Sequence, residues 1–319
     1  MSKPLVPLLT AVKSPEIIFE SAQLGHGFYP KSSHLIGFGF DGTACFRKGT
    51  KDGPDAIRKV SDGIESYSPY LDVDLEDISF YDCGNLCLGE SGKVDEQWAY
   101  ASQTLTLMLD KTNLKKDEVK LITLGGEHSV SYAPICAYLK QFPNLVLLHL
   151  DAHADLRDGY EGHRYSHASI IYRVQEHFGS DHQLIQYGIR SGTKDEYRWM
   201  KEKNTLCKSL IEFLNLVDLI DEKTPIYLTL DLDYFDPSFF PGTGTPEPGG
   251  EDFHSFISLV KRLKKRNFVG CDVVELAPNI DSTGNSDVFA AKVVRELLLS
   301  LQKPISNNAS GTSNSKGDL

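Results

Sequence analysis

Long apolar stretches are missing from this sequence, and so is a basic cluster of the kind that marks a nucleic-acid surface. No segment approaches the ~18 consecutive apolar residues of a membrane-spanning helix. The short apolar segment 5–12 is interrupted by Pro7, and no clear small-residue cleavage site follows it. The net charge is −11, and the one basic run, 261–266, has the pattern of a solvated helix face. We therefore expect a cytoplasmic protein with neither a membrane nor a nucleic acid as partner.

Cysteine is too sparse and too scattered to build a scaffold. The six cysteines form no C-x-x-C pair. Cys83 and Cys87 are close in sequence, but no second pair could complete a zinc knuckle with them. A chain of 319 residues that is 40% hydrophobic buries a core without disulfides. We interpret the cysteines as small buried thiols in a reducing compartment.

The chain has one domain between two less regular ends. Residues 1–33 lack strong periodicity and are predicted to form an N-terminal arm. Residues 34–302 show no linker and no internal repeat, so they form one predicted catalytic domain. Residues 303–319 are small, polar and rich in Ser, Asn and Gly, which predicts a disordered C-terminal tail.

Within the domain, short apolar runs alternate with segments of helical spacing. Continuous apolar strands alternating with helices are typical of an α/β domain whose parallel sheet is covered on both faces. The predicted strands are residues 34–40, 78–82, 120–124, 145–150, 184–189, 226–230 and 268–274. The clearest predicted helices begin at residue 54 or cover residues 95–109, 129–141 and 253–266.

Polar residues suited to bind metals follow three of these strands. The three segments are Gly125-Gly126-Glu127-His128, Asp151-Ala152-His153-Ala154-Asp155 and Asp231-Leu232-Asp233. Sites in open parallel sheets lie at the carboxyl ends of the strands, so the three segments should meet. Alternate residues of an extended chain also point to the same side.

Four carboxylates and two imidazoles in one crevice would repel strongly without cations, and two divalent ions would balance them. The predicted ligands are His128, Asp151, His153, Asp155, Asp231 and Asp233. A mixed oxygen and nitrogen set without thiolate suits two Mn²⁺ ions per chain, and leaves Ni²⁺, Co²⁺, Fe²⁺ and Zn²⁺ open.

Each cluster taken alone has an ordinary structural interpretation. A single D-x-D at a strand end is often a turn or a helix cap. A single histidine is more often a hydrogen-bonded core residue, which is how we interpret His149 inside its apolar run, and we expect His163 to face solvent. Three such clusters at strand ends are hard to explain in this way, because burying unpaired charge is costly.

Taken together, these motifs resemble the signature set of the arginase/agmatinase (ureohydrolase) family, closest to bacterial-type agmatinases. The resemblance extends from about residue 34 to residue 301 and includes Val274-Glu275-Leu276-Ala277-Pro278. It implies a three-layer αβα domain with a mostly parallel sheet of roughly eight strands. It also implies a homo-oligomer, either a trimer or a hexamer.

The resemblance assigns a role to each site residue. Asp151 and Asp231 would bridge the two metal ions, and Asp155 would also orient the bridging hydroxide. Glu275 would pair with the guanidinium of a small cationic substrate. His167, in a Tyr-Ser-His-Ala-Ser segment, matches the proton-shuttle histidine, with a solvent-facing loop histidine as the alternative. Glu247, in the Gly-rich segment 242–250, is a candidate for substrate contact.

The substrate implied is agmatine, cleaved to putrescine and urea, because no acidic pair directly follows Arg190 as it does in arginases. Lysines in the segment Phe46-Arg47-Lys48-Gly49-Thr50-Lys51 leave an anionic substrate end open, as in 4-guanidinobutyrate or formiminoglutamate. Arginine and guanidine also remain alternatives.

Two other classes of protein compete with this interpretation. A metal-dependent deacetylase would share the layered fold, but the D-x-D pair and the GGEH segment argue against it. A catalytically silent relative, acting as a subunit or a guanidine sensor, would have lost metal ligands, whereas all six are present here.

Overall fold

The structure is a computed structural model that describes residues 3–302. The predicted tail, residues 303–319, lies outside the described residues, so its disorder stays a prediction. Among residues 3–302, no helix has both the length and the apolar character needed to cross a bilayer.

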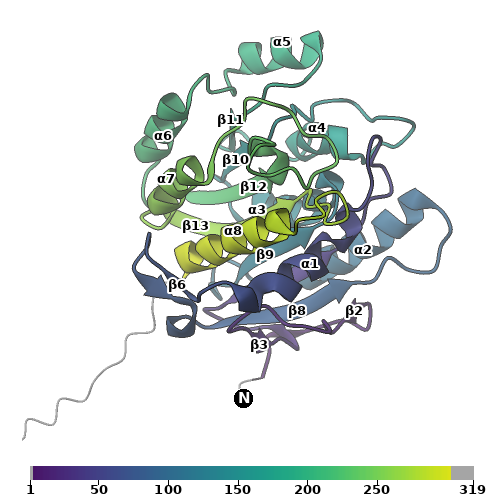
Figure 1. The fold of residues 1–319 in the computed structure, drawn as a ribbon, viewed down its shortest axis with the longest axis vertical. Helices are drawn as coiled ribbons and strands as arrows, with labels where there is room; N and C mark the ends of the chain where they lie inside the picture. Colours follow the sequence, from purple (N-terminus) through teal and green to yellow (C-terminus); the bar gives the residue numbers. More distant parts are fainter. Residues whose placement is uncertain (1–2, 303–319) are drawn as a thin grey trace, which may run out of the picture.

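A nine-stranded sheet forms the centre of the domain (Figure 1). Its order is β11-β10-β12-β13-β9-β5-β8-β2, with β3 also paired to β8. All its pairings are parallel except that of β2 with β8. The strands are β2 (Val12–Lys13), β3 (Gln23–Leu24), β5 (Ser33–Phe38), β8 (Phe80–Leu86), β9 (Lys120–Gly125), β10 (Val146–Leu150), β11 (Gln183–Tyr187), β12 (Pro225–Asp231) and β13 (Asn267–Val274). This confirms the predicted α/β class with a mostly parallel sheet.

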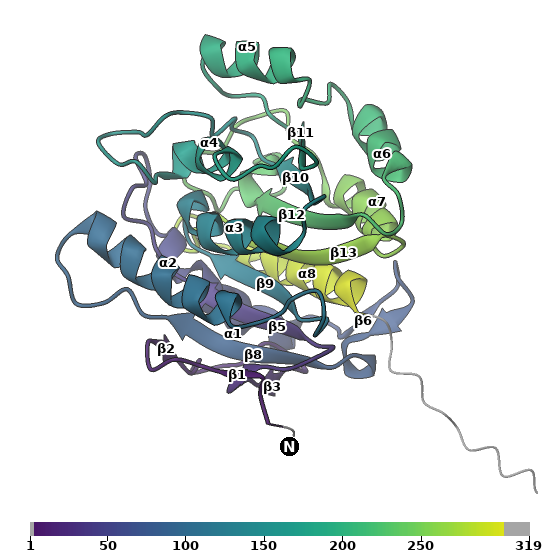
Figure 2. The same ribbon diagram turned by 180° about the vertical axis from the view of Figure 1, so that it is seen from behind.

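Helices cover both faces of the sheet, so the domain has three layers. Figure 1 shows α1, α7 and α8 in front of the sheet. Figure 2, which views the molecule from the other side, shows α2, α3 and α4 on the opposite face. The α-helices are α1 (Gly53–Val60), α2 (Val94–Asp110), α3 (Tyr132–Gln141), α4 (Ile170–Gln175), α5 (Lys194–Lys203), α6 (Leu210–Leu219), α7 (Phe253–Leu263) and α8 (Asn285–Leu301). The 3₁₀ helices are η1 (Thr50–Asp52), η2 (Ser61–Gly63), η3 (Leu75–Asp77), η4 (His128–Ser131), η5 (His167–Ser169) and η6 (Leu232–Tyr234).

The central strands owe their position to their composition. Every residue of β10 and of β12 is buried. Such continuous apolar runs satisfy both faces of a covered parallel sheet, whereas a strand in a sheet with one solvated face would alternate apolar and polar residues. Each fully buried Leu or Ile contributes roughly 1.5–3 kcal/mol relative to an exposed one. The centre of the sheet is therefore the most rigid part of the fold, and the strand ends inherit that rigidity.

The N-terminal arm pairs with the sheet edge rather than remaining irregular. Its β1 (Val6–Pro7) pairs with β4 (Gly27–Phe28), while β2 and β3 both pair with β8. A separate small pair, β6 (Tyr67–Ser68) with β7 (Val73–Asp74), lies beside the sheet. Strands of two residues are too short to show a period in the sequence, which is why only an arm was predicted.

A buried ion pair holds this edge together. Arg58 of α1 donates through Nε and Nη2 to the two carboxylate oxygens of Asp82 in β8, at 2.8 and 2.9 Å. The backbone N–H of Phe19, in the arm, donates to the same carboxylate at 3.0 Å. Removing one partner of such a buried pair costs about 3–5 kcal/mol. Asp82 thus joins the arm, a helix and a strand at one point.

Candidate metal centre

The polar clusters lie at the carboxyl ends of four neighbouring strands. β9 leads into His128, β10 into residues 151–155, β12 into residues 231–233 and β13 into Glu275. These strands are adjacent in the order β10-β12-β13-β9. The sheet therefore brings together, at one edge, side chains that are far apart in the sequence.

One group of side chains surrounds a single ring nitrogen of His128. Its Nδ1 lies 3.0 Å from Asp151 Oδ2, 3.1 Å from Asp155 Oδ2 and 3.5 Å from Asp231 Oδ2. All four residues are buried. His128 and the carboxylates of Asp151 and Asp155 are close enough to hold one metal ion between them.

A second group lies beside the first and shares Asp151 with it. His153 Nδ1 is 2.8 Å from Asp233 Oδ2 and 3.6 Å from Asp151 Oδ1. These three side chains are also spaced to hold a metal ion. Asp151 presents one oxygen to each group, as expected of a carboxylate between two cations. The structure therefore gathers all six predicted ligands into one double cluster.

One ring nitrogen of His128 is free to bind a cation. Nδ1 of His128 is buried and, among residues 3–302, meets no partner in hydrogen-bond geometry. The other ring nitrogen, Nε2, lies 2.8 Å from Thr229 Oγ1, and that hydroxyl donates to Asp272 Oδ1 at 2.6 Å. Because the Thr229 proton is committed to Asp272, the hydroxyl accepts a hydrogen bond from Nε2–H of His128. The neutral ring therefore has its lone pair on Nδ1, facing three carboxylates, and this arrangement fits a cation.

Without a cation, protons would take its place in the cluster. Burial lowers the pKa of His128, but the carboxylates of Asp151, Asp155 and Asp231 around Nδ1 outweigh burial and raise that pKa well above its usual range. Burial and the charge of Asp151 raise the pKa of Asp155 to about 7. Burial and the charges of Asp233 and Asp151 raise the pKa of Asp231 well above its usual range. Carboxyl groups that are crowded and buried together raise one another's pKa values. Cations between them would stabilise the ionised forms instead.

A row of buried polar side chains crosses the sheet just below the cluster. The pairing register places Gln186 beside His149, His149 beside Thr229, Thr229 beside Asp272, and Asp272 beside Thr123. All five are fully buried. Residues in register on neighbouring parallel strands point to the same face, so this row forms a floor under the metal ligands.

His149 occupies this floor as a hydrogen-bonded core residue. Thr205 Oγ1 donates to Gln186 Oε1 at 2.7 Å, which directs the Gln186 amide nitrogen to His149 Nδ1 at 3.1 Å. The His149 proton is then on Nε2, which lies 2.9 Å from Asp151 Oδ2. Such partners orient a ligating carboxylate and are part of a metal site's construction.

Two site residues adopt a backbone conformation that costs energy. Asp155 has φ 54° and Glu275 has φ 69°, and neither is glycine. Left-handed conformations of this kind cost on the order of 1–3 kcal/mol and persist where the surrounding structure enforces them. Here they turn both carboxyl groups into the cavity at the strand ends, which argues for a functional role of these two positions.

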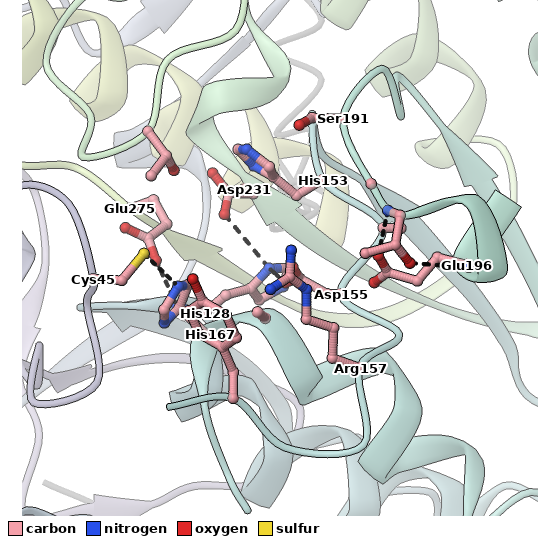
Figure 3. Close-up of a pocket in the computed structure, with 16 residues that line it drawn as sticks. Cys45, His128, His153, Asp155, Arg157, His167, Ser191, Glu196, Asp231 and Glu275 are labelled. Carbon is pink, nitrogen blue, oxygen red and sulfur yellow. Dashed lines mark hydrogen bonds and ion pairs between the residues drawn. The ribbon is translucent and has the colours of Figure 1, made fainter. Parts of the chain in front are cut away.

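The cavity above the cluster is shown in Figure 3. The metal-ligand candidates His128, His153, Asp155 and Asp231 line the base of this cavity. His167 and Glu275 lie on its wall. Glu275 is buried, and its Oε1 accepts a hydrogen bond from the backbone N–H of His128 at 2.9 Å. Burial, followed by the charges of Glu127 and Asp233, raises the pKa of Glu275 well above its usual range. A cationic ligand beside this carboxyl would stabilise its ionised form.

His167 lies at the start of η5 and its ring is enclosed. Burial, together with the positive charges of His153 and Arg157, lowers its pKa to about 4. The imidazole is therefore neutral near pH 7, whereas we expected an ordinary proton donor there. Its Nε2 lies 3.4 Å from Cys45 Sγ at the cavity wall. His167 is partly buried and lines the cavity.

The less certain candidates are not among the residues that line the cavity. Glu247 Oε1 is 3.9 Å from His153 Nε2, and the Glu247 carbonyl accepts hydrogen bonds from Arg190. His163 is partly exposed and lies 2.6 Å from Asp95, apart from the ligands. Lys48 donates to the Gly42 carbonyl instead of lining the cavity.

Comparison with known proteins identifies the family. The model of the arginase family matches residues 31–300 of the sequence. The chain belongs to the arginase family. It is 37% identical to the agmatinase of Bacillus anthracis over 280 residues, which is 86% of this chain and 93% of that protein. It is also 37% identical to the agmatinase of Bacillus subtilis, over 84% of this chain and 91% of that protein.

Solved structures of the family share the fold. A candidate agmatinase from Clostridium difficile superposes with a TM-score of 0.77 at 38% identity, over 86% of this chain and 98% of that chain. The arginase of Medicago truncatula superposes with a TM-score of 0.70 at 27% identity, over 87% of this chain and 89% of that chain. These matches confirm the arginase-like three-layer fold.

Several cavity residues of this family member were not selected from the sequence. Arg157 lines the cavity and stacks on Tyr160, with 4.4 Å between its guanidinium carbon and the ring centroid. Cys45 also lines the cavity. Glu127 is buried and accepts hydrogen bonds from Thr43. The signal available for Glu127 was its place inside the GGEH segment, whereas Thr43 had no signal beyond its position in a Gly- and Lys-rich loop.

Proposed function

We propose that the protein hydrolyses agmatine to putrescine and urea, using two divalent cations held by the double cluster. The observation that carries the proposal is the buried Nδ1 lone pair of His128 among three carboxylates, beside a second group that shares Asp151. The agmatinases of two Bacillus species, 37% identical over most of their length, support agmatine as the substrate.

The metal site would use His128, Asp151, Asp155 and Asp231 for one cation and His153, Asp151, Asp231 and Asp233 for the other. We propose Mn²⁺ in both positions, since imidazole and carboxylate ligands without thiolate suit that ion; Ni²⁺, Co²⁺, Fe²⁺ and Zn²⁺ remain possible occupants. When bound, the pair supplies a hydroxide nucleophile at neutral pH and stabilises negative charge that develops in the reaction.

Glu275 positions the guanidinium. Its Oε1 is engaged by the His128 backbone N–H, which leaves the other carboxylate oxygen for the substrate. A carboxylate matches a planar cation that offers several N–H donors. A guanidinium bound in this way would present its central carbon to the metal ligands at the base of the cavity. Asp155, whose backbone conformation directs it into the cavity, orients the nucleophile from below.

His167 moves a proton at the cavity wall. Being neutral near pH 7, the imidazole does not arrive with a proton. It accepts the proton that the oxygen nucleophile carries once that oxygen has added to the central carbon. It then delivers the proton to the amine nitrogen while the bond between that nitrogen and the central carbon breaks, so that the amine leaves neutral and urea remains.

The tail of the substrate is the part least defined by the cluster. Glu247 near His153 is an acidic group that the ammonium end of agmatine could reach, and we propose it as a secondary substrate contact. Arg157 is a cation in the same cavity, and it favours a second candidate: a guanidino or formimino compound with a carboxylate end, such as 4-guanidinobutyrate or formiminoglutamate.

Location and assembly complete the proposal. We propose a cytoplasmic protein, because all six cysteines are free thiols. We also propose a homo-oligomer, either a trimer or a hexamer, on the strength of family membership.

A urea-release panel tests the function. Mn²⁺-, Ni²⁺- and Co²⁺-loaded protein is assayed with agmatine, 4-guanidinobutyrate, arginine, guanidine and formiminoglutamate, the last by release of its formamide product. We expect kcat/KM for agmatine to exceed the others by at least about tenfold, or about 1.4 kcal/mol of barrier. A preference for a carboxylate-ended compound would transfer the assignment to the second candidate. Less than about one ion per chain after loading, together with no turnover, would support a silent relative instead.

A further inference from the structure

A chain of hydrogen bonds runs behind His167, away from the metal ligands. Thr43 Oγ1 donates to Glu127 Oε1 at 2.5 Å and lies 3.3 Å from His167 Nδ1. The backbone N–H groups of Thr43 and His167 also take part: the first donates to Glu127 Oε2 at 2.7 Å and the second to Thr43 Oγ1 at 3.2 Å. Glu127 and Thr43 are both buried.

The direction of each hydrogen bond follows from donor counting. A carboxylate only accepts, so the single proton of the Thr43 hydroxyl is committed to Glu127. The hydroxyl then has only lone pairs left for His167, and Nδ1 must be the donor. The remaining ring nitrogen, Nε2, is the one that lies near Cys45 at the cavity wall.

We propose that Glu127, acting through Thr43, holds the imidazole of His167 in the tautomer with the proton on Nδ1 and the lone pair of Nε2 directed into the cavity. Glu127 and Thr43 are positioning residues, since neither lines the cavity. The inference rests on the proposed function only in that His167 is taken as the proton carrier. An imidazole must offer an unprotonated nitrogen to the reaction before it can accept and pass on a proton.

The substitution Glu127→Gln tests the direction of the chain. The Glu127 Oε2 position accepts from the Thr43 backbone N–H, which cannot reverse, so the Gln oxygen must take that place. Its amide nitrogen then faces the hydroxyls of Thr43 and Ser129, which can reverse. The Thr43 proton is released toward His167 Nδ1, and the neutral imidazole shifts toward the tautomer with its proton on Nε2.

The readout is the tautomer itself. The full-length chain is labelled with ¹⁵N-histidine, the His167 signals are assigned by loss in His167→Asn, and the spectra are recorded above the pH of about 7 to which burial raises the pKa of Glu127. We expect protonated Nδ1 in the wild type and a shift of the population toward protonated Nε2 in Glu127→Gln. Ser129→Ala is the matched control: it removes another donor to Glu127 Oε1 without touching Thr43, and should leave the His167 tautomer unchanged.

Kinetics of a second pair of variants separate positioning from folding. Thr43→Val removes the hydroxyl and should lower kcat of the Mn²⁺-loaded protein by about tenfold or more, with KM and metal content within about twofold of the wild type. Thr43→Ser, which restores the hydroxyl, should recover kcat to within about twofold.

The outcomes are decisive in either direction. Protonated Nε2 in the wild type, or an unchanged tautomer in Glu127→Gln, overturns the proposal. So does a Thr43→Val variant with wild-type kcat. If the wild type hydrolyses none of the panel compounds, the proposed function fails, but the tautomer measurement still decides the role of Glu127 because it needs no substrate.

Discussion

Thr229 is the residue through which the floor of the sheet should control metal binding. Thr229→Val keeps the shape of the side chain but removes the hydroxyl that accepts a hydrogen bond from His128 Nε2. The metal-bound state needs the proton on Nε2, because Nδ1 must give its lone pair to the cation. In the variant, that state contains a buried N–H without a partner.

The expected loss follows from the two states of the protein. A buried donor left unsatisfied costs about 1–3 kcal/mol. The metal-free state escapes this cost, because the His128 proton can transfer to Nδ1, where Asp151 and Asp155 lie 3.0 and 3.1 Å away. The whole penalty therefore falls on metal binding. At 1.4 kcal/mol per factor of ten, the affinity for Mn²⁺ at the site that contains His128 should fall roughly 5- to 150-fold.

The fold offers a matched control. Thr123 lies on the other side of Asp272, in register with it on β9, and its hydroxyl is buried without a hydrogen-bond partner. Thr123→Val therefore removes a hydroxyl from the same row without disturbing His128. We expect its Mn²⁺ affinity to stay within about twofold of the wild type and its stability to rise slightly, because an unsatisfied polar group is lost.

Mn²⁺ affinity is measured by competition with a chelator of known affinity, and folding is checked by circular dichroism. If Thr229→Val bound Mn²⁺ as tightly as Thr123→Val and the wild type, Nδ1 of His128 would not be the ligand atom. Equal weakening in both threonine variants would instead indicate a general loosening of the sheet, and would equally refute the reasoning.

Three further predictions concern the ligands and the substrate. Asp151→Ala should abolish urea release and lower the Mn²⁺ content per chain, measured by elemental analysis, because both groups lose a shared carboxylate; retained activity would contradict the bridging role. Glu275→Gln should lower kcat/KM for agmatine about 10- to 150-fold at unchanged metal content, since a hydrogen bond to a charged group contributes about 1.5–3 kcal/mol. A loss below about threefold would show that Glu275 does not contact the substrate guanidinium. Metal binding should release protons and tighten as pH rises, because the raised pKa values of His128, Asp155 and Asp231 mean that the metal-free cluster holds protons that the cation must displace. Calorimetry in buffers of different ionisation enthalpy would measure this proton release. An affinity that does not change between pH 6 and 8 would contradict the prediction.

The sequence was sufficient wherever one pattern determined one structure. The runs that became β10 and β12 are apolar except for His149 and Thr229. Asp151 follows β10 and Asp231 ends β12, so both the strand and its ligand could be predicted. The edge of the sheet could not be predicted, because β2 and β3 have two residues each. Their pairing depends on tertiary contacts such as the Phe19 bond to Asp82.

The polar floor escaped prediction for a different reason. Thr229 and Asp272 lie inside runs that are otherwise apolar, and a buried polar residue in a strand has no local signature of its partner. The partner is on a neighbouring strand, so only the pairing register reveals it. Thr43 is a similar case, since its bonds to Glu127 and His167 join segments far apart in the chain.

The floor and the cluster above it impose opposite demands on the same strands. Burying Asp272 is costly, and three hydroxyls, from Ser131, Tyr227 and Thr229, offset that cost by donating to it. Three hydroxyl donors thereby occupy most of the hydrogen-bonding capacity of the Asp272 carboxylate, whereas Asp155 and Asp231 face the charges of other acids in the cluster above. This contrast separates supporting acids from metal-binding acids. A buried carboxylate filled by hydroxyl donors orients its neighbours, and one left to share protons with other acids is the place where a cation binds.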